Sequence, residues 1–339
     1  MTSTHRGAVR TRLWRDGVLT AEDFPLTEVS DHLADENALV WVDLDDPAHE
    51  QMHDLAAELQ LDPHAVEDAL ARGERTKATR YPTHTFVTVY ATHLEDGVVD
   101  DRVDVVSRLR TTRVSAFMLP RGMVTVRRGG PFEIADVVDR WDEHPDLLRF
   151  GTGALLHGLL DVVVDGQFDT VQALDDAIET LEDGLFDDTA ATRTIQRRIF
   201  RIRKELVLLR RVVLPMREVV TVVMRHRTEQ DTHPELDSWY TDLYDHVIRA
   251  TEWTESLRDM VTTLFETNLS LQDARLNTVM KKLSGWAAIV AVPTAITGWY
   301  GMNVPYPGFG QFWGVVAGTA IIVGSSSGLY LLFKQRDWL

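Results

Sequence analysis

Residues 49–53 read His-Glu-Gln-Met-His, a pattern with known metal chemistry. On a helix, histidines four positions apart can share a zinc ion, and the glutamate between them can serve as the base of a metalloprotease. The pattern falls, however, in the first turns of an amphipathic helix directly after a strand, and no third-ligand motif follows at Glu67 or Glu74. A solvated helix surface is therefore the favoured interpretation, with a zinc protease as the alternative.

The C-terminal part of the chain has the composition of a membrane hairpin. Residues 283–333 contain no Asp, Glu, Lys, Arg or His. Within them, residues 283–300 and 312–333 are each long enough to cross a bilayer, which needs about 20 residues per helix. The segment between them contains Pro-Tyr-Pro-Gly, which breaks any helix. Positive charges flank the hairpin at Lys281 and Lys282 and again at Lys334 and Arg336, so both termini are expected in the cytosol.

The rest of the chain is strongly acidic. The whole chain has a net charge of −17, and residues 283–339 contribute +1 through Lys334, Arg336 and Asp337, so residues 1–282 carry −18. This body should therefore repel nucleic acid and attract cations. The sequence has no cysteine, which excludes disulfides and thiolate metal sites. Residues 1–17 carry arginines without an apolar stretch, which argues against a signal peptide.

The elements that position these residues follow from hydrophobic periodicity. Residues 38–44 and 85–90 are rich in β-branched and aromatic residues and predict strands. Residues 47–59 and a segment beginning at Asp62-Pro63 predict short helices between them. Residues 102–127 predict two or three further strands, with breaks near Thr111-Thr112 and Pro120-Arg121-Gly122. We therefore expect an α/β domain over residues 1–150.

Long helical patterns replace the strands from about residue 151 to residue 282, where we expect a helical stalk. Residues 154–184 form an acidic helix and residues 190–227 a basic one with a kink at Pro215, which indicates either a paired hairpin or solvated faces. From Pro234 a helix continues into the first span and would reach about 100 Å. Its heptad seam predicts contact with copies of the chain or with neighbouring helices; the seam consists of Leu243, Val247, Ala250, Thr254, Leu257, Val261, Leu264, Asn268 and Leu271.

Gly301-Met302-Asn303, preceded by Tyr300 at the end of the first span, resembles the signature of the CorA family of divalent-cation transporters. The resemblance extends to Trp41-Val-Asp-Leu44, to residues 64–70, and to Tyr244-Asp245-His246, and covers nearly the whole chain. It implies an α+β membrane protein: a cytosolic α/β domain, a helical stalk, and a transmembrane hairpin over residues 283–339 in a funnel-shaped homopentamer.

The resemblance also implies a function and a set of pore residues. The protein would be a multi-pass protein of the cell (inner) membrane that carries Mg²⁺, with cobalt and nickel as further cargo, and not an enzyme. Gly301, Met302 and Asn303 would form the selectivity filter. The positions that match the family's pore lie at helical steps of three, seven or eight, close to one face of the helix; they are Asn277, Met280, Leu283, Ala291, Thr294 and Gly298.

Mg²⁺ fits such a pore because it gives up its water reluctantly and is best recognised while hydrated. Neutral oxygens of Asn303, Thr294 and Asn277 could accept hydrogen bonds from its water without binding the ion too tightly. Met280 and Leu283 suit a hydrophobic constriction. One departure from the family is that residues 304–311 carry no acidic residue after the signature.

The same resemblance implies gating by cytosolic Mg²⁺ that bridges carboxylates between subunits. The candidate residues are Asp242, Asp245, Glu95, Asp96 and Glu266. Besides Mg²⁺ no organic cofactor is implied, and the expected partners are further copies of the chain, the lipid bilayer and divalent cations. Two alternatives are a zinc transporter of the same family and a membrane-anchored sensory or binding protein that conducts nothing.

Overall fold

The computed structural model describes residues 8–71, 73–95, 108–185, 192–229, 233–302, 305, 307–336 and 338. The chain divides into two compact units, Met1–Thr263 and Leu264–Leu339. Helix α9 (Asp237–Tyr300) contributes to both units.

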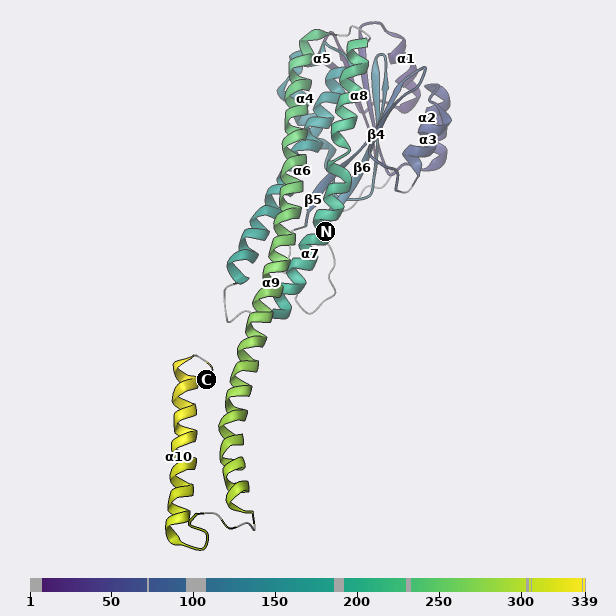
Figure 1. The fold of residues 1–339 in the computed structure, drawn as a ribbon. Helices are drawn as coiled ribbons and strands as arrows, with labels where there is room; N and C mark the ends of the chain where they lie inside the picture. The colour runs from purple at the N-terminus through teal and green to yellow at the C-terminus, as the bar shows by residue number, and fades with distance from the viewer. Residues whose placement is uncertain are drawn as a thin grey trace. The chain divides into compact units, whose positions relative to one another are not determined.

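A seven-stranded sheet organises the first unit, in the order β2-β1-β3-β7-β6-β5-β4 (Figure 1). Of the strand pairings in the described residues, only that between β3 and β7 is parallel. The strands are β1 (Val9–Arg15), β2 (Val18–Glu22), β3 (Ala38–Asp45), β4 (Lys77–Arg80), β5 (Thr85–Leu94), β6 (Leu109–Leu119) and β7 (Gly122–Arg128).

Helices cover both faces of the sheet. One face packs on a short helical turn and three short helices; these are η1 (Leu26–Glu28), α1 (Val29–Ala34), α2 (His49–Glu58) and α3 (Pro63–Leu70). The other face packs on a larger helical layer together with the start of α9; its members are α4 (Ile134–Glu143), α5 (Pro145–Leu148), α6 (Thr152–Leu185), α8 (Met216–Glu229) and the turn η2 (Pro234–Leu236). Helix α7 (Thr192–Val213) contacts α6.

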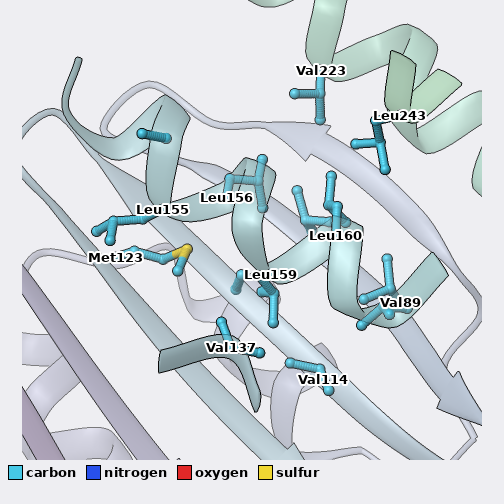
Figure 2. Packing of buried hydrophobic residues seen from close by; sticks show 14 of the residues in the cluster. Val89, Val114, Met123, Val137, Leu155, Leu156, Leu159, Leu160, Val223 and Leu243 are labelled. Atoms are coloured by element: carbon cyan, nitrogen blue, oxygen red, sulfur yellow. The ribbon is translucent and has the colours of Figure 1, made fainter. Parts of the chain in front are cut away.

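The sequence of β3 explains why two cores form. Successive side chains of a strand point to opposite faces, and Val40 joins the core under α2 and α3 while Trp41 joins the core under α6. On the second side, leucines of α6 recur at helical spacing, and Leu155, Leu159 and their neighbours are buried against the sheet (Figure 2). Burying one such side chain stabilises the fold by about 1.5–3 kcal/mol.

A buried ion pair joins the two parallel strands. Asp43 on β3 is fully buried and accepts hydrogen bonds from Arg127 on β7 at 3.0 and 2.9 Å and from the Thr125 hydroxyl at 2.7 Å. Burial raises the pKa of Asp43, and the Arg127 guanidinium opposes that rise. The pair therefore holds β3 and β7 in register at a point where an unpaired charge would be costly.

The heptad seam of α9 is buried by the chain's own helices. Its members from Leu243 to Val261 are all buried. Trp253 donates a hydrogen bond to Asp175 of α6 at 3.1 Å, and Glu255 accepts one from Arg210 of α7 at 2.6 Å. For this part of the seam, contact with neighbouring helices of the same chain is confirmed.

Most of the predicted elements are confirmed. The strands at residues 38–44 and 85–90 are β3 and β5, and Pro215 separates α7 from α8. The break predicted at Thr111-Thr112 was wrong, because β6 runs through both threonines, which pair with Thr92 and Ala91 of β5. Threonine is β-branched and suits a strand, so this segment had no physical reason to break. Strands β1, β2 and β4 were not predicted.

The second unit contains the last part of α9 and helix α10 (Phe312–Gln335). Both helices are long and apolar enough to cross a membrane, and only 6% of the most apolar window of each is buried within the chain. The Tyr300 ring lies against Gly318, where an added Cβ would meet ring atoms at 3.3–3.5 Å. Gly308 (φ +88) approaches Gly314 more closely, since a Cβ added to Gly308 would lie 3.1 Å from the Gly314 Cα atom. Glycines thus allow the connection and the end of α9 to lie against the start of α10.

Candidate functional site

The six predicted pore positions lie on an exposed face of α9. Each of them is exposed in the single chain, including Met280 and Leu283 at 58% and 63%. The positions of the same segment that are buried or half-buried lie on the opposite side of the helix at 3.6 residues per turn; they are Gly285, Ala288, Ile289, Val292, Pro293, Ile296 and Tyr300. Since Tyr300 packs on α10, the candidate pore face is the face that this chain's own second span leaves uncovered.

The polar side chains on this face keep part of their hydrogen-bonding capacity free. The Thr294 hydroxyl donates to the Val290 carbonyl at 2.8 Å, one turn earlier. Its oxygen keeps acceptor capacity because a hydroxyl has two lone pairs. Thr294 and the exposed Asn277 can therefore each offer an uncharged oxygen to a passing hydrated cation.

The signature tripeptide begins directly where α9 ends. The Gly301 amide donates to the Thr297 carbonyl at 2.8 Å, and the Met302 amide donates to the Trp299 carbonyl at 3.2 Å. Both residues are exposed. Asn303 lies outside the described residues, as do Val304 and Tyr306, so its role in a filter stays a prediction.

A cluster of two aspartates and a histidine lies in the first unit. Within the described parts of the chain, Asp161, Asp165 and His246 form the one group of three or more candidate metal ligands, with ligand atoms within 4.8 Å of one another. The two aspartates come from α6 and the histidine from α9. Arg140 of α4 forms ion pairs with both carboxylates, with Asp165 at 2.8 Å. The cluster therefore contains a guanidinium as its own counter-ion.

Burial shapes the electrostatics of this cluster. It raises the pKa of Asp161, while the Arg140 charge acts in the opposite direction. One turn earlier on α6, burial lowers the pKa of His157, whose ring nitrogen Nε2 lies 3.2 Å from the Trp239 carbonyl. A further positive charge would favour the ionised form of Asp161.

The predicted regulatory residues are spread over the chain. Asp242 is exposed and its carboxylate lies 3.9 Å from His246, at the edge of the cluster. Asp245 and Glu266 are exposed, the latter in the second unit. Glu95 accepts a hydrogen bond from Arg110 at 2.8 Å, which lowers its pKa.

Asp96 lies outside the described residues. Among the described carboxylates of this prediction, Asp242 lies next to the cluster through its contact with His246.

Sequence reasoning missed the residues at the centre of this cluster. His157, Asp161 and Asp165 recur every four positions on α6, which predicts one helical face with three titratable groups. That signal was available. Arg140 carries no local signal, because it comes from another helix, and His246 is singled out in the sequence only as part of Tyr244-Asp245-His246.

The two histidines of residues 49–53 do not form part of any such group. Both are exposed on α2, and the described residues place no third ligand with them. The interpretation as solvated helix surface is therefore favoured.

Comparison with known proteins places this architecture in a family. Residues 36–335 match the family described as CorA-like Mg²⁺ transporter protein. The cobalt/magnesium transport protein CorA of Thermotoga maritima is 27% identical over 291 residues, which cover 82% of this chain and 77% of that protein.

Two solved structures share the fold. The CorA magnesium transporter of Methanocaldococcus jannaschii superposes with a TM-score of 0.77 at 20% identity, with all of both chains covered. The cytoplasmic domain of ZntB from Vibrio parahaemolyticus does so with a TM-score of 0.58 at 11% identity, covering 78% of this chain and 98% of that one. With most of its length matched, this chain belongs to the CorA-like Mg²⁺ transporter family, a family of membrane proteins that transport divalent cations.

Proposed function

We propose that the chain carries Mg²⁺ into the cell through a pore lined by α9, with Co²⁺ and Ni²⁺ as further cargo. Five copies would surround the pore as a homopentamer, with the Gly301-Met302-Asn303 loop at its outer mouth. The observation that carries the proposal is the uncovered face of α9, which combines neutral oxygens at Asn277 and Thr294 with apolar side chains at Met280 and Leu283.

The chemistry of this face suits a hydrated ion. Mg²⁺ exchanges its water slowly, so rapid passage favours recognition through the hydration shell. Neutral oxygens can accept hydrogen bonds from that shell and still release the ion, whereas a ring of carboxylates would hold it longer. A constriction of Met280 and Leu283 side chains could close the pore by excluding water.

The membrane potential provides the driving force. A divalent ion that moves inward gains about 2.3 kcal/mol per charge per 100 mV, or roughly 5 kcal/mol in total. The lysines before the first span and Lys334 and Arg336 after the second favour a topology with both termini in the cytosol of the cell membrane. This orientation places the signature loop outside.

Cytosolic Mg²⁺ would gate the pore by bridging carboxylates. The candidates are Asp242, Asp245 and Glu266 on α9, Glu95 at the end of β5, and Asp96, which follows it in the sequence. Weakly held ions at such positions would act as a low-affinity sensor, and their loss would leave like charges to repel. The acidic surface of the chain, with a net charge of −17, supports a role for cations in holding copies together.

Zinc is the second candidate cargo, since the cytoplasmic domain shares its fold with that of ZntB. The intact Gly-Met-Asn signature favours Mg²⁺, because neutral amide and carbonyl oxygens suit magnesium whereas zinc prefers nitrogen and sulfur ligands.

Paired substitutions on the two spans test the pore proposal. Thr294→Val removes an oxygen from the candidate face, and Thr319→Val removes a hydroxyl that makes the same bond one turn back on α10, at 2.9 Å. In proteoliposomes with an inside-negative potential, we expect at least a threefold loss of Mg²⁺ uptake for Thr294→Val and none for Thr319→Val. Equal losses of uptake in the two variants would contradict the assignment of the pore face. Uptake of Zn²⁺ without Mg²⁺ would favour a zinc transporter of the same family.

A further inference from the structure

A groove of about 620 Å³ lies between α7 and α9 in the first unit (Figure 1). Its lining includes four arginines, and none of the described residues that line it is Asp or Glu. The arginines are Arg203, Arg210, Arg211 and Arg258. Such a concentration of positive charge is unusual in a chain with a net charge of −17, and a pore for cations does not explain it.

The carboxylates of the same chain balance only part of this charge. Glu255 of α9 pairs with Arg210 at 2.6 Å and with Arg258 at 2.8 Å. Arg203 and Arg211 are exposed on α7 and form no ion pair within the part of the chain that the structure describes. Two guanidinium groups of the groove can therefore pair with a partner that carries negative charge.

Apolar side chains in and beside the groove favour a protein as that partner. Val207 lines the groove and is 46% exposed, while Leu206 and Val261 line it and are buried. Phe200, seven residues before Val207 and therefore on nearly the same face of α7, is 62% exposed. Another chain could bury this apolar surface, which an inorganic ion could not do.

An exposed acidic stripe on α6 has the complementary charge. Asp169, Asp176, Glu179 and Asp183 follow one another at steps of seven, three and four, which places them on one helical face. All four are exposed, and none forms an ion pair with another described residue. Like charges one turn apart repel each other, so this stripe also lacks a balancing partner within its own chain.

The arginine groove and the acidic stripe match in length. From Asp176 to Asp183 the stripe extends about 10 Å, and from Arg203 to Arg211 the arginines extend about 12 Å, at a rise of 1.5 Å per residue. Because the groove and the stripe are different surfaces, a contact between two copies through them is head to tail. Repeated contacts of this kind close into a ring when the rotation between copies allows it.

We propose that the arginine groove of each copy binds the acidic stripe of the next copy. Charged groups that have no ion pair within one chain then pair between chains. The inference rests on the proposed homopentamer and adds the surfaces that join its copies. Complementary charges at such partly exposed positions fix the register and the choice of partner more than they add affinity.

Cysteine cross-linking of the full chain in detergent tests this contact, and the sequence has no native cysteine to give a background. Val207→Cys lies in the groove, and Thr180→Cys lies on the stripe, one turn after Asp176. With a short bifunctional thiol reagent, we expect this double variant to give a ladder of covalent species up to the pentamer. Each single variant should stay monomeric in denaturing electrophoresis, because two different surfaces meet. Val207→Cys with Thr221→Cys, at an exposed position on α8, should give at least fivefold less cross-linked product.

Charge reversal in the cysteine-pair chain tests the role of the ionic groups. Arg203→Glu together with Arg211→Glu should lower the yield of the ladder at least fivefold, because the groove then repels the stripe. Adding Asp176→Arg and Glu179→Arg to that chain should restore the yield to within twofold. A loss that the second reversal does not restore would overturn the proposed pairing.

A matched control separates the groove from general charge effects. Arg80→Glu together with Arg225→Glu makes the same change in net charge at side chains outside the groove and should leave the yield within twofold. Equal losses in the two double-arginine variants, or a ladder from a single-cysteine chain, would overturn the contact. A chain that has the size of a pentamer in detergent but gives no ladder would contradict the groove contact alone. A chain that has the size of a monomer would contradict the homopentamer itself.

Discussion

Replacing Arg140 by glutamine tests whether its guanidinium holds the acidic cluster together. Arg140 pairs with Asp161, whose side chain is 14% exposed, and with Asp165, which is 45% exposed. Removing one partner of a fully buried pair costs about 3–5 kcal/mol, whereas exposed pairs contribute at most about 1 kcal/mol. Because this network is intermediate in exposure, we expect a loss of about 2 kcal/mol. That loss lowers the melting temperature by about 4–8 °C for a unit of this size.

The assay is thermal unfolding of the full chain in detergent, followed by tryptophan fluorescence with and without millimolar Mg²⁺. In Arg140→Gln, the freed carboxylates and His246 should take up Mg²⁺ and recover most of the loss, while the parent should respond less. Arg15→Gln is the matched control, because it breaks an ion pair with Asp35 in which the two side chains are 44% and 36% exposed. If Arg140→Gln costs no more than Arg15→Gln, or if Mg²⁺ stabilises both variants equally, the guanidinium has no special role in the cluster.

Three further changes have defined outcomes. Asp43→Ala leaves the buried Arg127 with only its longer ion pair to Asp45, at 3.5 Å, and should cost about 3 kcal/mol in chemical denaturation. Gly318→Leu overpacks the contact between the two spans and should lower the thermal stability of the hairpin by about 1–3 kcal/mol, whereas Gly324→Leu, at a position with open space around it, should not. Burial lowers the pKa of His84, so the unfolded chain takes up the proton first as the pH falls below about 6.5. Stability should therefore drop as the pH falls below about 6.5, and His84→Gln should flatten that drop.

The elements that could be predicted are those whose burial follows a local period. Residues 38–44 are buried on both faces and read as a strand, and the leucines of α6 recur at helical spacing. The two spans are recognisable because no charge interrupts them. Strand β2 could not be predicted in this way, since its side chains are mostly exposed and its pairing with β1 is what fixes it.

The candidate sites differ in the same respect, namely whether their residues follow a local sequence pattern. The six candidate pore positions come from the family resemblance, and because all of them lie on one helix, their spacing predicts that they share one of its faces. The acidic cluster joins α4, α6 and α9. Only the packing of distant segments brings such residues together, so no local sequence pattern predicts that they meet.

Magnesium uptake into proteoliposomes under an inside-negative potential, with Asn303→Ala beside the parent chain, tests the proposed pore most directly. We predict that the parent takes up Mg²⁺ and that the variant loses at least nine-tenths of that uptake while it still assembles to the same size in detergent. Undiminished uptake by the variant would contradict the assignment of the outer mouth. A parent chain that moves no divalent cation would contradict transport itself and favour a membrane-anchored sensor.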